Sequence, residues 1–124
     1  MKYSAKHAIK NLKPGAEWVL YGNDYSGLNW LDSSQTKPTE SEVSAKVIEL
    51  NNAEPMRLLR LERDMLLQET DWVVTKASET GVAETDAWKT YRQALRDITS
   101  GASPKLDSLY NLDKSSVTWP TKPS

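Results

Sequence analysis

Apolar and polar positions alternate in two short runs near the start of the chain. Residues 18–21 and 28–31 are rich in residues that favour strands, and a segment of Gly, Asn, Asp and Ser separates them. In the second run Asn29 lies between two apolar residues, as expected for a half-buried strand. Residues 1–37 are therefore predicted to be strand and turn, with an N-terminal β-hairpin that must pack on another element.

A helical period begins after Pro38. Thr39 and Glu42 have the spacing of a capping box, which marks a helix N-terminus. The apolar positions that follow have helical spacing: Val43, Val47 and Leu50. The segment NNAEPM should stop or bend this helix, because Pro55 lacks the amide hydrogen that a helix interior uses. Proline suits the first turn of a new helix, so a second helix is expected from about Pro55 to Asp71.

The second helix is apolar around much of its circumference. Leu58, Leu61 and Met65 share one face, whereas Leu59 and Leu66 lie roughly 100° around the axis from it. This surface is wider than one neighbouring element would cover. Two interpretations remain open: burial of both sides within one small domain, or burial of one side internally and of the other against a second subunit or client.

The polar segment TKASETGVAETD, which follows Trp72 and includes Gly81, is predicted to be a connecting loop. Thr85 can cap a third helix, with Asp86 favourable near its positive end. The apolar stripe of this helix is narrow: Trp88, Tyr91, Leu95 and Ile98. Gly101 is expected to adopt the left-handed conformation that ends a helix. The remaining residues hold three prolines and no long period, which predicts an extended tail.

These elements predict a mainly α-helical protein with a small N-terminal β-hairpin, so the fold class is α+β. Residues 1–37 would form the hairpin or attachment region, and residues 38–52 a short helix or linker. Residues 53–124 would form a helical domain, in which an antiparallel helical hairpin is followed by the extended tail.

The composition limits the chemistry of the chain. Its 124 residues hold 16 Lys and Arg against 17 Asp and Glu, so the net charge of −1 offers no bulk attraction for nucleic acid or an anionic membrane. The chain has no cysteine, which excludes disulfides and thiolate chemistry. No segment approaches about 18 consecutive apolar residues and no signal peptide core is visible, so a soluble, cytoplasmic protein is expected.

Catalytic and metal sites are not expected. His7 is the one histidine, and no two carboxylates join a histidine at the spacing of metal ligands. Residues two apart on a helix point in different directions, so the pairs Glu62–Asp64 and Glu69–Asp71 should not converge. Arginines along the second helix are outnumbered by neighbouring acids, which favours solvated faces over nucleic-acid binding. We therefore predict a non-catalytic protein without a cofactor.

Five tryptophans are many for a chain of this length that has no phenylalanine. Most of them, Trp88 in particular, are expected in the core. Trp72 is expected to fold back onto Trp88 and Tyr91, which would staple a helix end to its antiparallel neighbour. Trp119 lies in the proline-containing tail and is expected to dock on another element or chain, because tryptophan is enriched at the centres of protein interfaces.

Three segments in order, EPMRLLRLERDMLLQETDW, WKTYRQALRDI and VTWPTKP, resemble the phage tail assembly chaperone-like domain of tailed bacteriophages. The resemblance covers about residues 54–123. The residues it carries over are Arg63, Thr70, Asp71, Trp72, Trp88, Tyr91, Arg92, Leu95, Arg96, Trp119 and Pro120. The segment VVTKASETGVAETD departs from relatives, which often have an acidic, proline-containing turn there, so client specificity that resides in this segment does not transfer.

The resemblance implies a protein that helps a tail fibre or another tail component to fold, trimerise or attach, in the host cytoplasm during assembly. The residues expected to bind this partner are Leu59, Leu66, Trp72 and Trp119. The alternative is a structural virion protein of the tail, baseplate or fibre tip, which would place the chain in the virion tail. A homo-oligomer is compatible with both interpretations, and neither nucleic acid nor a membrane is expected as a partner.

Overall fold

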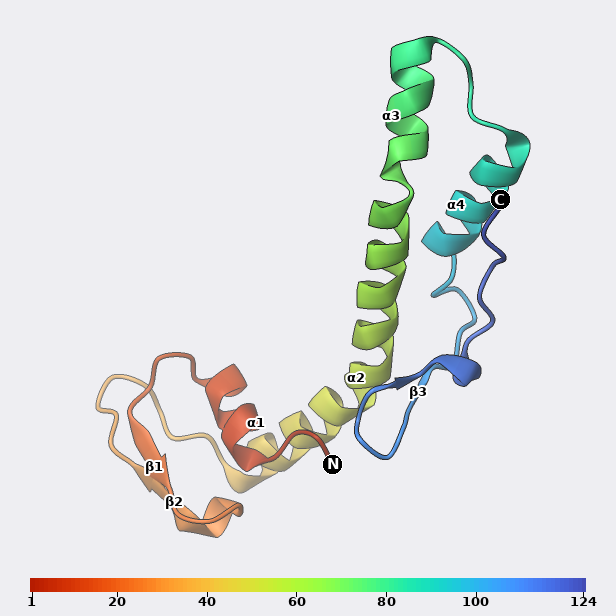
Figure 1. Ribbon diagram of the computed structural model, residues 1–124. Coiled ribbons are helices and arrows are strands. Elements are labelled where there is room, and N and C mark those ends of the chain that lie inside the picture. The colour runs from red at the N-terminus through yellow and green to blue at the C-terminus, as the bar shows by residue number, and fades with distance from the viewer. The chain divides into compact units, whose positions relative to one another are not determined.

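The computed structural model describes residues 1–124, which form two compact units, Met1–Glu54 and Pro55–Ser124 (Figure 1). The elements in chain order are α1 (Ala5–Leu12), β1 (Trp18–Leu20), η1 (Tyr25–Gly27), β2 (Leu28–Trp30), α2 (Glu40–Glu69), α3 (Asp71–Thr80), α4 (Asp86–Arg96), β3 (Lys105–Leu106), β4 (Leu112–Asp113) and η2 (Lys114–Ser116). The boundary between the units falls inside α2. Each unit therefore contains a part of this helix.

Helix α1 corrects the sequence analysis, which assigned residues 1–37 to strand and turn alone. The backbone N–H of Ser4 donates to Nδ1 of His7 at 3.1 Å and so helps to fix the start of the helix. The buried residues of α1 have helical spacing: Ala5, Ala8 and Ile9. An isolated helix of eight residues is marginal in water, so packing rather than local propensity stabilises it.

Strands β1 and β2 pair antiparallel, with Trp18 opposite Trp30. The two ends of the connection between them lie close together, because Tyr21 N–H donates to the carbonyl of Gly27 at 2.9 Å. A Cβ atom at position 27 would lie 1.9 Å from the carbonyl oxygen of Tyr21. The connection therefore requires glycine at this position.

The core of the first unit lies between α1, the two strands and the first turns of α2 (Figure 1). Its buried residues are Ala5, Ala8, Ile9, Leu28 and Val43, and the half-buried residues packed against them are Leu12, Trp18, Leu20, Tyr25, Trp30 and Val47. Two of the five tryptophans are thus part of this core, as expected for a chain without phenylalanine.

Polar contacts fasten the N-terminal residues to α2. Tyr3 N–H donates to Oδ1 of Asn51 at 3.0 Å, and Nδ2 of Asn51 donates back to the carbonyl of Tyr3 at 3.1 Å. The buried carboxylate of Glu54 accepts a hydrogen bond from the Tyr3 hydroxyl and pairs with Lys2 at 3.4 Å. These contacts compensate for removing Glu54 from water, which would otherwise be costly.

The start of α2 confirms the predicted capping box. Glu42 N–H donates to Oγ1 of Thr39 at 3.1 Å, and Thr39 N–H donates to Oε1 of Glu42 at 3.3 Å. The helix does not stop near residue 55 but continues to Glu69 with Pro55 inside it. Proline removes one backbone hydrogen bond. The residues on either side of it, Glu54 and Leu59, are buried.

The segment after Trp72 is helical as far as Thr80, so the predicted loop is wrong for that part and the connecting loop is confined to residues 81–85. Helix α3 ends at Thr80, and Gly81 caps it in the left-handed conformation with φ 71°. Val73 is the one buried residue of α3. A helix with so little buried surface leaves no apolar stripe in the sequence, which is why the periodicity did not reveal it.

Helix α4 begins as predicted, because the Thr85 side chain accepts a hydrogen bond from the N–H of Trp88 at 3.4 Å. It ends at Arg96, before the expected Ile98, and turns follow. Gly101 is left-handed with φ 73°, as expected.

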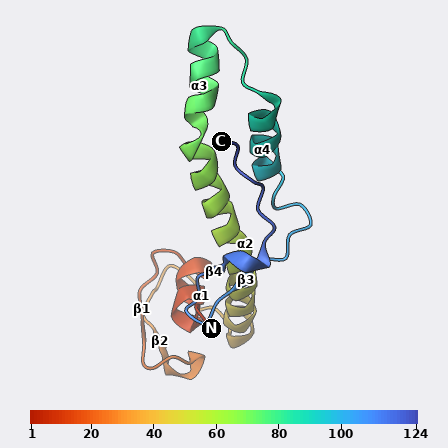
Figure 2. The same cartoon turned by 45° about the vertical axis from the view of Figure 1, so that its right-hand side comes forward.

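In the second unit α4 lies alongside α3 and the end of α2 (Figure 2). The buried residues of this unit are Leu59, Thr70, Val73, Tyr91 and Leu95. The C-terminal segment is less extended than predicted, because β3 and β4 pair antiparallel. An ion pair of 3.2 Å between Lys114 and Glu62 attaches this segment to α2.

Candidate functional site

The side chain of Arg92, on α4, joins the end of α2 to the start of α3. Its Nη1 donates to the carbonyl of Leu67 at 2.9 Å and to Oγ1 of Thr70 at 2.7 Å. Its Nη2 donates to Oδ1 of Asp71 at 2.9 Å. We refer to these four residues as the Arg92 junction. The last carbonyls of a helix lack partners within it and carry partial negative charge, so a cation is favourable at this place.

Three aromatic rings extend this contact between the helices. Trp72 and Trp88 meet edge to face with their ring centroids 5.8 Å apart, and Trp88 meets Tyr91 in the same manner at 6.0 Å. The prediction that Trp72 folds back onto Trp88 is confirmed. Burial raises the pKa of the Tyr91 hydroxyl above its usual value, and the charge of Glu69 adds to this effect.

The residues singled out by the resemblance do not all meet. Thr70, Asp71, Trp72, Trp88, Tyr91 and Arg92 form the junction and the adjoining ring contacts. The others lie elsewhere: Leu95 is buried, Arg63 pairs with Asp64 at 3.0 Å, Arg96 donates to Gln93 at 2.8 Å, and Pro120 lies in the C-terminal segment. The motif therefore marks the contact between α4 and the α2–α3 connection more than any single surface.

The four residues expected to bind a partner differ widely in exposure. Leu59 is 0% exposed and faces the interior of the second unit, whereas Leu66 is half-buried. Trp72 keeps 54% of its surface exposed although it contacts Trp88. Trp119 is half-buried, and its indole Nε1 donates to the carbonyl of Lys114 at 2.9 Å.

The burial of Leu59 corrects the assignment of faces on α2. Leu61 and Met65, which are 48% and 58% exposed, carry the outward apolar surface in this part of the helix. They are four residues apart and so lie on the same face. We refer to Leu61 and Met65 as the exposed stripe of α2. A helix that is apolar nearly all round does not reveal in its sequence which side will be covered.

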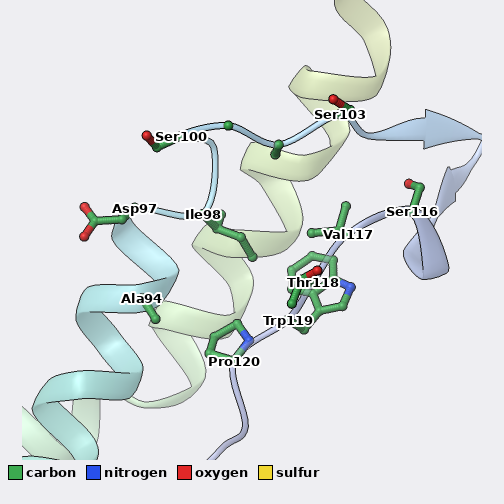
Figure 3. Close-up of a pocket in the computed structure, with 12 residues that line it drawn as sticks. Ala94, Asp97, Ile98, Ser100, Ser103, Ser116, Val117, Thr118, Trp119 and Pro120 are labelled. Atoms are coloured by element: carbon green, nitrogen blue, oxygen red, sulfur yellow. The ribbon is translucent and has the colours of Figure 1, made fainter.

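The groove beside Trp119 has a volume of about 480 Å³ (Figure 3). Ile98, from the turn after α4, lines one side of it, and Val117, Trp119 and Pro120, from the C-terminal segment, line the other. Because the indole N–H of Trp119 is already bonded to Lys114, this side chain is docked within its own chain.

Three of the four acids that the sequence analysis considered as carboxylate pairs form ion pairs. Glu62 pairs with Lys114, Asp64 with Arg63, and Asp71 with Arg92. The pKa of His7 is lowered by partial burial and, to a lesser extent, by the charges of Lys6 and Lys10. No three His, Asp or Glu side chains gather closely enough to hold a metal ion, and no helix is both long enough and apolar enough to span a membrane.

A family model described as phage tail assembly chaperone protein matches residues 56–124. The matched segment coincides with the second compact unit, residues 55–124, and includes the whole Arg92 junction. This match confirms the resemblance seen in the sequence. The role that the description names is the assembly of phage tails, which is in general not a catalytic role. No curated protein and no solved structure matches the chain.

Proposed function

Because this chain belongs to the phage tail assembly chaperone protein family, we propose that it binds a tail fibre or another tail component and assists its folding and assembly. The binding would take place in the host cytoplasm, before the tail is complete. One observation carries the proposal: the family match covers the same residues as the second compact unit, and this unit exposes large apolar side chains.

The exposed stripe of α2 and the ring of Trp72 are the surfaces that we assign to this binding. Each is about half exposed, at 48% for Leu61, 58% for Met65 and 54% for Trp72. Apolar surface removed from water stabilises a complex by roughly 25 cal/mol per Å². A specific complex commonly buries about 800 Å² on each partner, so neighbouring residues would contribute as well.

Trp72 suits the role of an anchor because its position is already fixed. Its contact with Trp88 and the bond between its neighbour Asp71 and Arg92 hold this part of the chain before any partner arrives. A side chain that is ordered in advance loses less conformational entropy on binding. Partly exposed, well-supported tryptophans are frequent at the energetic centres of interfaces.

We assign a binding role without a catalytic step to the second unit. Three of the four acids that the sequence offered as candidate pairs, Glu62, Asp64 and Asp71, form ion pairs with Lys114, Arg63 and Arg92, which favours a structural role for them. The first unit, residues 1–54, lies outside the family match and has its own core. We assign it the role of an attachment region.

Co-expression with the candidate tail fibre protein, followed by affinity capture through a tag on the fibre, tests the binding. The double variant L61S/M65S should reduce capture at least about tenfold, since two apolar contacts of 1 kcal/mol or more would be lost. The matched control is I48S, which changes an aliphatic side chain of similar exposure, 57%, in the first unit. Equal capture of both variants would assign the binding to another surface.

Mass spectrometry of purified phage particles separates this function from a structural role in the virion. A chaperone that is released after assembly should be abundant in infected-cell lysate and absent from particles. A fixed copy number per tail would instead identify a permanent component of the tail, baseplate or fibre tip.

A further inference from the structure

The first sixteen residues carry positive charge that their own segment does not balance. They hold four lysines and no acid, so their side chains have a net charge of +4, although the whole chain has a net charge of −1. Lys2 pairs with Glu54 at 3.4 Å, whereas Lys6, Lys10 and Lys13 form no ion pair. A segment with one sign of charge indicates a partner of the opposite sign.

The three unpaired lysines lie in one row along α1. Lys6 and Lys10 are one turn apart and therefore on the same side of the helix, and Lys13, at its C-cap, follows one turn later. Lys6 and Lys10 are exposed, whereas Ala8 and Ile9, on another side of the helix, are buried. We refer to Lys6, Lys10 and Lys13 as the lysine row of α1.

The helix dipole does not account for the whole row. Cations are favourable in the last turn of a helix, where Lys10 lies, but unfavourable in the first turn, where Lys6 lies. The first turn of α1 has no acid that would offset Lys6. The pKa of His7 is lowered by burial and then by the charges of Lys6 and Lys10, so the local field is positive. An anionic partner would relieve this repulsion.

A groove of about 600 Å³ lies at one end of the lysine row. Lys10 and Lys13 line it together with the turn at residues 14–16 and Trp18, the first residue of β1. Its lining holds two bases and no acid. A concave surface with one sign of charge concentrates groups of the opposite sign.

Two acids near β1 do not neutralise the groove. Glu17 and Asp32 are absent from its lining. The carboxylate of Asp32 accepts hydrogen bonds from the N–H groups of Glu17 and Gln35 at 2.9 and 2.7 Å. Neither acid forms an ion pair with a lysine. The lysine row therefore keeps its charge for a partner.

Strand β1 has one edge without a neighbouring strand. The N–H of Tyr21 donates to the carbonyl of Gly27, and bonded pairs alternate along an antiparallel ladder. The N–H and C=O groups of Trp18 and Leu20 therefore point away from β2. None of these four groups bonds within the chain. Such an edge accepts an extended segment through main-chain hydrogen bonds.

We infer that the first unit binds an extended, acidic segment of a tail component, which pairs with the edge of β1 and places carboxylates on the lysine row of α1. This inference rests on the proposed function, in which the first unit is an attachment region, and it names the chemistry of the attached segment. Trp18 belongs to both the edge and the groove, so one segment can contact both.

The two contacts together favour a polypeptide as the partner. A nucleic acid offers phosphates to the lysine row but no peptide backbone to the edge of β1. The spacing also suits a strand. Successive lysines of the row are about 6 and 4.5 Å apart along the helix axis. Side chains on one face of a strand recur about every 6.6 Å, so carboxylates at alternate positions reach neighbouring lysines.

Titration of the full-length chain with an acidic hexapeptide tests the site without a tail protein. The probe has blocked ends and carries glutamate at alternate positions, with threonine and valine between them. In NMR spectra at low salt the amide signals of Trp18 and Leu20 should shift, and their hydrogen exchange should slow, with a dissociation constant on the order of millimolar.

The same peptide with glutamine in place of glutamate is the matched probe. It should bind at least about tenfold more weakly, because the charge-assisted bonds are lost. Equal binding of the two peptides overturns the role of the lysine row. Binding that leaves the amides of Trp18 and Leu20 unchanged overturns the pairing with β1.

The double variant K6Q/K10Q removes two charges from the row and should weaken binding of the glutamate peptide about tenfold. The matched control K37Q/K46Q removes two charges from the first unit at residues outside the row and the groove. Equal weakening in both variants would mean general charge attraction, and the inference would be wrong. The single variant K13Q, at a residue after the last turn of α1, should weaken binding about threefold and repeats the test if K6Q/K10Q loses its fold.

Two other occupants of the lysine row would overturn the inference. A hexathymidylate that binds more tightly than the glutamate peptide, with shifts at the same lysines, would identify a nucleic-acid site. A sedimentation coefficient that rises with protein concentration in the wild type but not in K6Q/K10Q would assign the row to a second copy of this chain.

Capture by the tagged tail fibre protein separates this inference from the proposed function. If the wild type is not captured, the proposed function fails together with the assignment of the segment to a tail component, and the titration still decides whether the site takes an acidic strand. Equal capture of the wild type and K6Q/K10Q, with loss in L61S/M65S, leaves the proposed function standing and refutes the lysine row as an attachment site. Loss of capture in K6Q/K10Q, with K37Q/K46Q unaffected, supports both.

Discussion

Nη1 of Arg92 lies 2.9 Å from the carbonyl oxygen of Leu67, at the point where α2 ends. The same guanidinium bonds Thr70, which is buried, and Asp71, the first residue of α3. One charged side chain from α4 therefore donates hydrogen bonds to acceptors at the end of one helix and at the start of the next. The position of Trp72, which follows Asp71, depends on this junction.

Replacing Arg92 with lysine should destabilise the second unit. A lysine carries its three donors on one nitrogen, so it cannot reproduce the geometry in which Nη1 bonds Leu67 and Thr70 while Nη2 bonds Asp71, and at least one of these bonds would be lost. We expect a loss of about 1 to 3 kcal/mol in the free energy of unfolding, measured by chemical denaturation. The control is R96K, at an exposed arginine that bonds Gln93 within its own helix, which should change stability by less than about 0.5 kcal/mol. Equal effects of the two variants would contradict this role of Arg92.

Replacing Trp72 should separate its structural contribution from binding. W72A removes the edge-to-face contact with Trp88 and should cost about 1 kcal/mol of stability. W72F retains an aromatic ring at this place and should cost less than W72A. Near-UV circular dichroism and thermal unfolding measure these effects. If W72A is as stable as the wild type, the ring contact does not hold the helices together.

Replacing Gly27 with alanine should disrupt the first unit. The added Cβ would meet the carbonyl oxygen of Tyr21 at 1.9 Å, and backbone rather than a flexible side chain would have to move. We expect a loss of about 2 kcal/mol or more, visible as a lower melting temperature. The neighbouring exposed residue provides the control, since S26A should be nearly neutral. A stable G27A variant would mean that the connection between β1 and β2 can adopt another path.

Protonation of His7 should weaken the first unit. Its pKa lies below the usual 6.5, because partial burial, Lys6 and Lys10 disfavour the charged form. Neutral Nδ1 accepts the Ser4 N–H bond, and a protonated ring cannot accept it. A lowered folded pKa means that this stability is present above pH 6.5 and is lost as the pH falls through the folded pKa.

Thermal unfolding between pH 7.5 and pH 5.5 measures this effect, and NMR titration of the His7 ring measures its pKa. The variant H7Q should unfold with a weaker pH dependence over this range than the wild type does, because it has no group that titrates there. A folded pKa above that of an unfolded histidine would reverse the sign and contradict the prediction.

Features that depend on neighbours in the sequence could be predicted from it. The capping box of Thr39 and Glu42 and the Thr85 cap each need residues only three positions apart, so no distant partner decides them. Large aromatic side chains on neighbouring helices bury apolar surface when they pack together. The contact of Trp72 with Trp88 was predicted on that basis. The three segments that identify the family, and their order along the chain, are likewise properties of the sequence alone.

The tertiary structure decided which surfaces are covered. Helix α1 is too short to be stable by itself, and α3 buries too little to show a stripe, so neither was predicted. In α2 the sequence placed leucines on several faces, and only the position of the neighbouring elements buries Leu59 and leaves Leu61 exposed. A sequence states which side chains are apolar or charged, but their exposure depends on residues far along the chain, and exposure determines what they can bind.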